Sequence, residues 1–503
     1  MLFSLVLIIV TFGAIRCVVA NRLPLLPQTF RESSSVLRVS EPYNVGLLSP
    51  LSSSLSSLSD REWTILSHPL HPKHNVRVKK SNICNDTAIG YTGYIDIGAR
   101  HLFFYFFESR NDPDTDDVIF WTNGGPGGSS AIGLFFENGP CRIIDEDGPK
   151  FHPESWNTNA NIFFVDQPVG TGFSYAEFGE TVYTSEDAAV DVAAFVSVFF
   201  DNFSQFKGRS FHMAGESYGG RYLPLFASAV YDQNAVRIRA GLPPINLTSV
   251  IIGNGVMDAY KTILSYYDIQ CTPASVEPFV NITACVNMKN IVGRCERWMK
   301  KACFDHFDFI DCSTAYNFCE SATTAPFYHT GRNPFDISLP CHGEVFDSLC
   351  YPETVHIQNY LNNQANRAML GVDKGFTGNW TSFNLLINTH FDSVGDILHP
   401  TTDHVAALLE RGIRVLIFAG VYDLICNHVG TERWALAMEW SGKEAFVGAE
   451  MKEWLVDGKK AGLTRSAKGL TYATVDAAGH MVPYNKPKEA LEMIQRWLAK
   501  EKL

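Results

Sequence analysis

Residues 211–230 read FHMAGESYGGRYLPLFASAV, and this stretch decides the fold that the sequence predicts. The apolar run at 211–214 is typical of a short buried strand, and residues 221–230 read as a helix. Between them lies GESYG, at 215–219. A G-x-S-x-G turn that joins a strand to a helix lifts its serine hydroxyl to the carboxyl end of a sheet. The context therefore favours Ser217 as a nucleophile over a residue of an ordinary turn.

Apolar runs on both sides of this turn predict further strands of the same sheet. They lie at 117–122, 161–165, 249–253, 414–419 and 470–475, while 187–200 and 488–497 have helical patterns. Alternating strands and helices are typical of an α/β fold with a mostly parallel central sheet. We therefore expect one α/β-hydrolase domain over residues 81–503. Residues 256–350 break the alternation and hold most of the 12 cysteines, which predicts a helical insertion stapled by disulfides.

Composition excludes several other classes of protein. The 503 residues are 46% hydrophobic and 19% charged, which excludes a mainly disordered or collagen-like chain. The formal net charge of −12 argues against a nucleic-acid-binding surface, because such a surface needs clustered positive charge. No metal or cofactor motif appears, and we expect neither. His68, His71 and His74 read as a solvated loop, since no cysteine or paired carboxylate accompanies them.

The first 80 residues differ from the rest of the chain. The apolar run at 2–15 predicts a secretory signal peptide over residues 1–20, with an uncleaved anchor as the alternative. No later stretch is long enough to span a membrane, so we expect no stable membrane insertion after signal removal. Residues 21–80 are rich in Ser and then in His, Pro and Lys, which predicts a pro-segment or a flexible linker. Lys79 and Lys80 form a candidate dibasic processing site.

Two further features bear on the compartment. Twelve cysteines are many for a reduced cytosolic protein, which favours the secretory pathway, with a vacuole, a lysosome or the medium as the destination. Five N-x-[ST] sequons permit glycosylation there, although chance alone predicts about as many. They begin at Asn85, Asn202, Asn246, Asn281 and Asn379.

A serine nucleophile needs a base and a group that orients the base. In the α/β-hydrolase fold these follow the serine in the order Asp or Glu, then His. His480 lies in AAGHMVPY, just after the predicted strand 470–475, and Asp423 lies in AGVYDLICN, just after 414–419. Asp476 and Asp403 compete for the role of Asp423. We favour Asp423 because it follows its own strand.

Acyl transfer also needs hydrogen-bond donors for the oxyanion of its tetrahedral intermediate. NGGPGG, at 123–128, follows the predicted strand 117–122, which is where this fold places an oxyanion loop. Its glycines free backbone N–H groups to point inward, although a plain glycine-rich turn is the alternative. The second donor would be the N–H of Tyr218, the residue after the nucleophile.

The whole constellation resembles the serine carboxypeptidases. The matching stretches include YTGYIDI, WTNGGPGGSS, SWNTNANIFFVDQPVGTGFSYA, FHMAGESYGGRY, GRNPFDI, IFAGVYDLICN and DAAGHMVPYNKP, in the family's order from about 91 to 486. The resemblance implies release of C-terminal residues from peptides and proteins through an acyl-enzyme at acidic pH. It implies Ser217, Asp423 and His480 as the triad, and the backbone N–H groups of Gly125 and Tyr218 as the oxyanion hole.

The resemblance also implies a site for the free carboxylate of the substrate. The family's residues match Asn123, Gly124, Glu137 and Glu216. Several carboxyl groups so close together cannot all ionise cheaply, so at least one glutamate must keep a proton and can donate it to the substrate. We therefore expect peptide binding to weaken as the glutamates ionise.

Two apolar pockets are implied on either side of the scissile bond. The pocket for the last side chain would hold Phe136, Phe335, Tyr351 and Met481. Val256, Tyr266, Ile425 and Cys426 would lie near the penultimate side chain. Apolar residues would then be preferred at both positions, while ordinary core packing is the alternative for all eight.

The cysteine pattern differs from that of the family at one disulfide. Removal of Cys17 with the signal leaves an odd number, and the family pattern implies Cys426 as the free thiol. It implies the pairs Cys271–Cys285, Cys295–Cys319, Cys303–Cys312 and Cys341–Cys350. Carboxypeptidase Y-like members have a cysteine at the position of Gly128, with its partner near Phe383, and both are missing here. Cys84 and Cys141 are left over, and we hypothesise that they pair.

Three rival functions remain open on the sequence. An acyltransferase of the same family would pass the acyl group to an alcohol. A non-catalytic relative would protect or bind partners, although an intact triad counts against it. A general lipase or esterase would not need the carboxylate site.

Overall fold

The computed structural model describes residues 55–85, 87–177, 179–343 and 345–503. The predicted signal peptide, residues 1–20, and residues 21–54 of the predicted pro-segment or linker lie outside the described residues. Within the described residues, no helix has the length and apolar character that a membrane crossing requires.

One mixed sheet organises the domain. The six strands at its centre are parallel to their neighbours, and the strands at both ends are antiparallel. All six predicted strands occur, as β5, β8, β10, β11, β14 and β17. In spatial order the sheet runs β1 (Thr64–Ser67), β2 (His74–Ser81), β3 (Gly90–Ile97), β4 (Arg100–Phe107), β8 (Ala160–Val165), β5 (Asp117–Thr122), β10 (Phe211–Ser217), β11 (Leu247–Gly255), β14 (Arg414–Gly420), β17 (Leu470–Val475), β16 (Lys459–Ala467) and β15 (Lys452–Val456), with β9 (Tyr175–Ala176) on β4.

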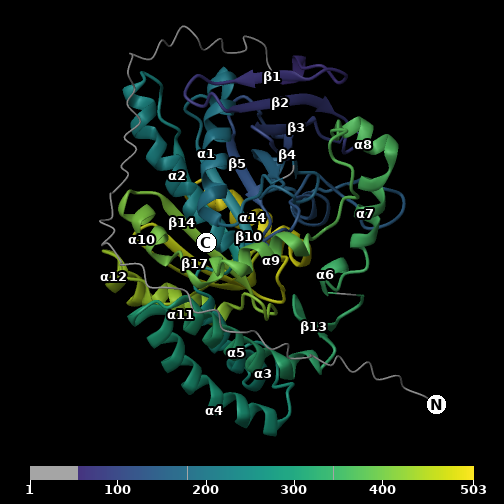
Figure 1. Ribbon diagram of the computed structural model, residues 1–503. Helices are drawn as coiled ribbons and strands as arrows, with labels where there is room; N and C mark the ends of the chain where they lie inside the picture. The colour runs from purple at the N-terminus through teal and green to yellow at the C-terminus, as the bar shows by residue number, and fades with distance from the viewer. Residues whose placement is uncertain (1–54, 86, 178, 344) are drawn as a thin grey trace, which may run out of the picture. The chain divides into compact units, whose positions relative to one another are not determined.

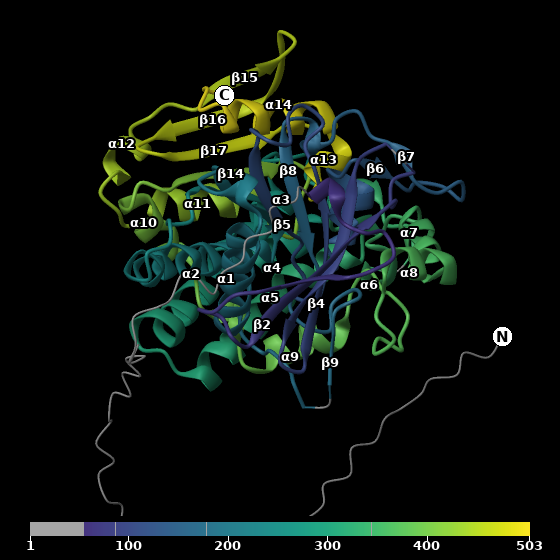
Figure 2. The ribbon, with the colours of Figure 1, turned by 90° about the horizontal axis from the view of Figure 1, so that it is seen from above.

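Helices cover both faces of this sheet. Strand side chains alternate between the two faces, so that Val118 and Phe120 join one apolar core while Ile119 and Trp121 join the other. Figure 2 shows α1 and α2 on one side of the strands and α7 and α8 on the other. The first core is closed by α1 (Ser185–Asn202), α2 (Gly219–Arg239), α10 (Thr402–Glu410) and α11 (His428–Ala437), and the second by α7 (Thr354–Asn362), α8 (Gln364–Leu370), α13 (Val482–Asn485) and α14 (Pro487–Leu498). The expected α/β-hydrolase architecture is confirmed.

The N-terminal strands differ from the sequence-based expectation. The sequence predicts a pro-segment or flexible linker up to residue 80, yet β1 and β2 lie within 64–81 and extend the sheet beyond β3. The linker interpretation is wrong for this part because Leu66, Val76 and Val78 are buried in the first core. Lys79 is also buried, and it pairs with Thr92 inside the sheet. The candidate dibasic site is therefore part of a strand.

The histidines of the same segment are also built into the fold. His68, expected in a solvated loop, is buried, and its Nε2 lies 2.9 Å from Oδ2 of Asp201 on α1. The ring of His71 packs against those of His68 and His74. Burial and the neighbouring histidines lower the pKa of His71 to about 3. These contacts tie the turn between β1 and β2 to α1.

A helical excursion separates β11 from β14, as the cysteine pattern predicts. Figure 1 shows α3, α4 and α5 packed beside one another. They enclose a third apolar core, lined by residues such as Ile263, Met299 and Phe327. The excursion continues beyond residue 350 into α7 to α9, which lack the cysteines that marked the predicted insertion. Its elements before α7 are α3 (Ala259–Cys271), α4 (Ile282–Met299), η6 (Lys300–Asp305), α5 (Phe309–Tyr328), β12 (Arg332–Asn333), β13 (Asp336–Pro340) and α6 (Val345–Ser348), and α9 spans Leu385–Ser393.

All five expected disulfides are present. Four staple the excursion, and the fifth joins the segment after β2 to β6 (Cys141–Arg142), which pairs with β7 (Lys150–Phe151). Cys426 is a free and buried cysteine, as expected. The bonded pairs are Cys84–Cys141, Cys271–Cys285, Cys295–Cys319, Cys303–Cys312 and Cys341–Cys350.

The five sequons differ in accessibility. Asn85, Asn246, Asn281 and Asn379 are exposed. Asn202 is buried at the end of α1, and its Nδ2 donates to the carbonyls of Ser67 and Val198. A glycan on Asn202 would replace these hydrogen bonds and needs space that packed side chains fill. We therefore expect no glycan on Asn202 in the folded chain.

Candidate active site

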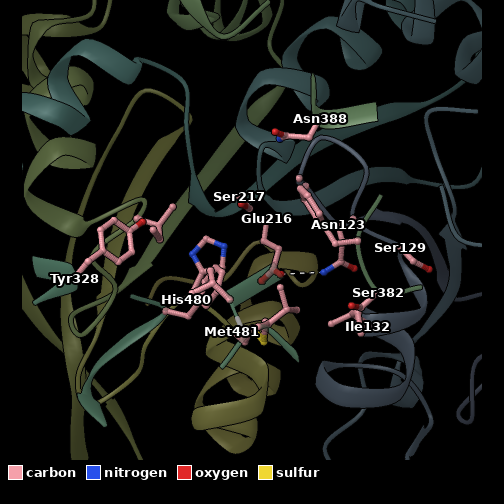
Figure 3. A pocket seen from close by; sticks show the side chains of 18 residues that line it. Asn123, Ser129, Ile132, Glu216, Ser217, Tyr328, Ser382, Asn388, His480 and Met481 are labelled. Atoms are coloured by element: carbon pink, nitrogen blue, oxygen red, sulfur yellow. Dashed lines mark hydrogen bonds between the residues drawn. The ribbon is translucent and has the colours of Figure 1, made fainter. Parts of the chain in front are cut away.

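The predicted catalytic residues lie at one edge of the sheet. Ser217 ends β10, Asn123 directly follows β5, Asp423 follows β14 and His480 follows β17. These strands are parallel, so their carboxyl ends meet at the same edge. Figure 3 shows Ser217, Glu216, Asn123 and His480 around one cavity.

The turn at Ser217 has the strained backbone of a nucleophile elbow. Ser217 has a backbone φ of +61°, a value that residues other than glycine rarely adopt. Gly215, just before it, lies so close to β5 that a Cβ there would stand 2.2 Å from the carbonyl oxygen of Thr122. α2 begins at Gly219, two residues after Ser217. Strain of this kind concentrates at functional sites, which supports the interpretation of Ser217 as a nucleophile.

His480 and Asp423 form the expected pair. Nδ1 of His480 lies 2.8 Å from Oδ2 of Asp423, so the imidazole donates through Nδ1 and leaves Nε2 as the basic nitrogen. Asp423 is fully buried and accepts three further hydrogen bonds, from Nδ2 of Asn254 and from the backbone N–H groups of Ile425 and Cys426. The competing carboxylates lie elsewhere: Asp476 pairs with Lys460, and Asp403 is in the first turn of α10.

Electrostatics favour a protonated His480 when Asp423 is ionised. Burial alone would lower the pKa of His480, but the charge of Asp423 and the hydrogen bond to it outweigh burial and raise that pKa. Asp423 therefore stabilises the imidazolium that forms on His480 during a reaction. Burial raises the pKa of the neighbouring Cys426 thiol well above its usual range, so this thiol stays protonated.

The predicted oxyanion loop lies against the elbow. A Cβ on Gly124 would stand 2.3 Å from the backbone nitrogen of Tyr218 and 2.7 Å from Cβ of Ser217. Only glycine fits this approach, which brings Gly124 beside the backbone nitrogen of Tyr218. Gly125, the other predicted oxyanion donor, lines the same cavity as Ser217.

A buried carboxylate that the sequence analysis did not single out holds this loop. Asp166 accepts hydrogen bonds from the hydroxyl of Ser129, the N–H of Ser130 and the N–H of Phe173. The Ser130 hydroxyl in turn accepts from the N–H of Asn123. Complete burial raises the pKa of Asp166 to about 6. Its only sequence signal is a charged residue directly after the apolar strand β8.

Two buried glutamates meet at a single amide. Nδ2 of Asn123 donates to Oε1 of Glu137 at 3.0 Å and to Oε1 of Glu216 at 2.9 Å. Burial raises the pKa of both groups, and the charge of Glu137 raises the pKa of Glu216 further, well above its usual range. Oε2 of Glu137 is buried and has no hydrogen-bond partner among the described residues. The pair is therefore poised to hold a proton.

The cavity in front of Ser217 has a volume of about 210 Å³. Sheet edge, oxyanion loop and excursion all contribute to its walls, and Figure 3 shows Tyr328 and Met481 on the side of His480, with Ile132 and Ser382 on the side of Asn123. Of the eight predicted pocket residues, Phe335, Met481 and Ile425 line it. Additional lining residues that the sequence did not reveal are Ile132, Tyr328, Val345, Leu349, Ser382, Phe383 and Asn388.

The other five predicted pocket residues do not line this cavity. Phe136 is buried and stacks on Tyr484, with ring centroids 3.9 Å apart, and Tyr351 packs against both rings. The hydroxyl of buried Tyr266 donates to the carbonyl of Ile425. The expectation that Phe136 and Tyr351 line the cavity is therefore not met. Val256, Tyr266 and Cys426 are expected only near the penultimate side chain; the N–H of Val256 donates to the carbonyl of Ser217, and Cys426 lies beside Asp423 and His480.

One cluster has residue types that bind metals. Ligand atoms of Asp423, Cys426 and His480 lie within 4.8 Å of one another. Oδ2 of Asp423 and Nδ1 of His480 already bond to each other, and Asp423 also accepts from Asn254 and from two backbone N–H groups. The donor set therefore fits a catalytic pair better than a metal centre.

Known proteins share this arrangement over most of the chain. The serine carboxypeptidase family model matches residues 85–500. Carboxypeptidase Y from Komagataella phaffii is 39% identical over 433 residues, which cover 85% of this chain and 80% of that protein. Carboxypeptidase Y homolog A from Talaromyces marneffei is 40% identical over 418 residues, which cover 82% and 72%.

A solved structure supports the fold. The prohormone-processing carboxypeptidase Kex1(delta)p from Saccharomyces cerevisiae superposes with a TM-score of 0.71. The match covers 89% of this chain and 96% of that one, at 22% sequence identity.

Proposed function

The chain belongs to the serine carboxypeptidase family, and from that premise we propose how its own residues release the last residue of a peptide. Ser217 is the nucleophile, His480 the general base and Asp423 the group that orients His480. The hydroxyl oxygen of Ser217 attacks the carbonyl carbon of the last peptide bond, and its proton passes to Nε2 of His480. The 2.8 Å contact between His480 and Asp423 fixes the ring for this transfer.

The tetrahedral intermediate carries its negative charge on the former carbonyl oxygen. The backbone N–H groups of Gly125 and Tyr218 donate to this oxyanion. These hydrogen bonds stabilise a negative charge that is present only in the intermediate. Collapse of the intermediate breaks the peptide bond, and the proton on His480 passes to the leaving amine. Water then attacks the acyl-enzyme by the same route and restores Ser217.

One observation carries the preference for free C-termini: Asn123 spans two buried glutamates beside the nucleophile. A protonated Glu216 can donate to a carboxylate, as can the backbone N–H of Gly124, while the amide of Asn123 holds the two glutamates in place. Oxygen atoms of an amide or ester would gain less from these donors, because charged acceptors form the stronger hydrogen bonds. The site thus selects a substrate that ends in a carboxylate.

Two titrations limit the pH at which this site works. His480 must be unprotonated to act as a base, so activity falls on the acid side of its pKa. Glu216 must be protonated to donate, so peptide binding weakens as the pH rises through its raised pKa. Activity is therefore limited on both sides; with the acidic hydrolysis that the family resemblance implies, we propose that ionisation of Glu216 sets the alkaline limit.

The substrates are peptide and protein C-termini, and the cavity suggests which ones. Ile132, Phe335, Leu349 and Met481 give it a largely apolar wall, which favours apolar side chains at the end of the substrate. Five disulfides support an oxidising compartment, so we place the enzyme in the secretory pathway.

A matched pair of substrates tests the proposal. A blocked dipeptide with a free C-terminus and the same dipeptide as its amide are incubated with the enzyme at mildly acidic pH, with Ser217→Ala as the control. Release of the last residue from the acid, much slower release from the amide, and no release by the variant support it. Equal cleavage of both substrates would contradict the carboxylate site and favour a general lipase or esterase.

An alcohol added as a second acceptor separates hydrolysis from acyl transfer. The proposal expects the free acid as the main product at low alcohol concentration. Ester as the main product would identify an acyltransferase, and failure of the wild type on every substrate would favour a non-catalytic relative.

A further inference from the structure

Tyr218 makes a contact that the chemistry above does not use. Its backbone N–H lies at the elbow, while its side chain points into the protein and is 4% exposed. The phenol hydroxyl donates to Oδ2 of Asp396 at 2.7 Å. Asp396 begins η7 (Asp396–Leu398) and is itself buried. One side chain therefore connects the residue after the nucleophile to a carboxylate far along the chain.

Asp396 collects hydrogen bonds from two helices. Ser185, the first residue of α1, donates its N–H at 2.9 Å and its hydroxyl at 2.7 Å. Arg221 on α2 lies 3.2 Å away through Nε and also donates to the backbone carbonyl of Asp396. The same guanidinium reaches Glu186 at 2.6 Å. Figures 1 and 2 show α1 and α2 side by side, and Asp396 bonds to the N-terminal ends of both.

The hydrogen bond to Asp396 constrains a residue whose backbone and ring are already fixed by other contacts. Tyr218 caps α2 with φ −60° and ψ −10°, and its ring packs against Tyr222 and Phe391. With the hydroxyl fixed as well, both ends of the side chain are held. Rotation of the peptide that carries the Tyr218 N–H would then have to move the ring and break the bond to Asp396.

We propose that Asp396 is a positioning residue that, through the Tyr218 hydroxyl, holds the Tyr218 N–H in its oxyanion-binding orientation. The inference rests on the proposed role of that N–H. A donor aimed at the oxyanion stabilises charge that is absent from the bound substrate. Loss of the hydrogen bond between Tyr218 and Asp396 therefore lowers kcat and leaves KM nearly unchanged.

Tyr222 provides a matched control on the same helix. Its side chain is fully buried one turn after Tyr218, and its hydroxyl has no hydrogen-bond partner among the described residues. Tyr222→Phe and Tyr218→Phe thus remove the same atom from the same helix. Only Tyr218→Phe removes a bond to Asp396.

The experiment compares the two variants with the wild type on a blocked dipeptide. We expect Tyr218→Phe to lower kcat about tenfold with KM within about twofold, because small misplacements of catalytic groups have effects of this size. Tyr222→Phe should stay within about twofold of the wild type in both constants, since it removes no hydrogen bond. Asp396→Asn, which keeps the shape of the side chain, should lower kcat by at least as much as Tyr218→Phe.

A second readout separates positioning from general loosening. A peptide aldehyde adds to Ser217 and forms an oxyanion, whereas a blocked amino acid with a free carboxylate only occupies the carboxylate site. We expect Tyr218→Phe to weaken aldehyde binding about tenfold and leave binding of the blocked amino acid unchanged.

Two results would overturn the inference: equal kcat and aldehyde affinity in Tyr218→Phe and Tyr222→Phe, or a rise in KM alone. Failure of the wild type to cleave the dipeptide and bind the aldehyde would instead reject the proposed function on which the inference depends. Activity of the wild type together with a silent Ser217→Ala variant shows that the site works, so the two failures are distinguishable.

Discussion

Gly128 lies directly opposite Phe383 in an isolated antiparallel bridge, which joins the oxyanion loop to the segment before α9. The family resemblance implies a disulfide between the position of Gly128 and one near Phe383, and this chain has neither cysteine. Around the bridge, the N–H of Ser129 donates to the carbonyl of Ser382, and the N–H of Asn384 donates to the carbonyl of Gly127. Backbone hydrogen bonds thus hold the two segments together in place of the missing disulfide.

The double variant Gly128→Cys/Phe383→Cys is predicted to form a sixth disulfide. Residues opposite each other in an antiparallel pair have Cα atoms about 4.5–5.5 Å apart, which falls within the range of disulfides. A loop of this length could gain about 5 kcal/mol at most. The gain should be smaller, because a Cβ on Gly128 would lie 3.0 Å from the Gly124 carbonyl oxygen. Thiol titration and thermal unfolding with and without reductant provide the measurement.

The two single-cysteine variants are the controls for this prediction. Each adds a thiol without a partner and should melt no higher than the wild type. A double variant that retains two extra free thiols after oxidation would show that the bridge is too distant or too strained to cross-link.

Glu216→Gln is predicted to remove the alkaline loss of peptide binding. In the wild type, KM rises as Glu216 loses its proton, whereas an amide remains a donor at every pH. The raised pKa of Glu216 also means that its contribution to stability is complete below the usual glutamate range and is lost as the pH rises through the raised value. KM and melting temperature measured across the pH range should both become flatter on the alkaline side.

Glu320→Gln serves as the matched control. Burial raises the pKa of Glu320 too, but this residue lies on α5 and does not line the cavity. Its variant should keep the wild-type dependence of KM on pH. An equally steep rise of KM in Glu216→Gln and wild type would show that another group controls substrate binding.

Lys79 is predicted to resist trypsin in the folded protein. The chain enters a protease active site in extended and accessible form, whereas Lys79 is buried and paired within β2. Lys73, exposed in the turn between β1 and β2, is the internal control. Mass spectrometry during limited digestion should detect cleavage after Lys73 at least about tenfold faster than after Lys79. Early cleavage after Lys79 would mean that β2 detaches from the sheet.

Glycan mapping is predicted to find Asn246 modified and Asn202 unmodified in protein from a secretory host. Nδ2 of Asn202 makes two backbone hydrogen bonds inside the fold, whereas Asn246 is exposed. Deglycosylation in heavy-isotope water followed by peptide mapping distinguishes the two sites. A glycan on Asn202 in active enzyme would contradict the packing of α1 against the end of β1.

Local sequence patterns predicted the centre of the fold well. The six parallel strands are buried on both faces, so each appears as a continuous apolar run, and β17 has the predicted bounds 470–475. β2 was missed because only Val76 and Val78 face the core while charged residues alternate with them. β15 and β16 alternate in the same way and gave an equally weak signal.

Some residues of the candidate site could be predicted from local sequence patterns and others could not. Ser217, Asp423 and His480 each follow a recognisable strand, so their meeting could be predicted from topology. Glu137 follows no strand and required the family resemblance. Asn254 and Asp166 are polar residues at strand ends whose roles depend on neighbours distant in sequence, and no local pattern distinguishes them from turn residues.

Three parts of the chain build the cavity walls: the sheet edge, the oxyanion loop and the excursion. The excursion holds none of the proposed catalytic or carboxylate-binding residues. Ser217, Glu216 and His480 sit on the sheet edge, whereas Tyr328, Leu349 and Phe383 belong to the excursion between β11 and β14. The excursion has its own apolar core and its own disulfides. Substitutions within the excursion can therefore alter the preference for substrate side chains while the proposed catalytic residues stay the same.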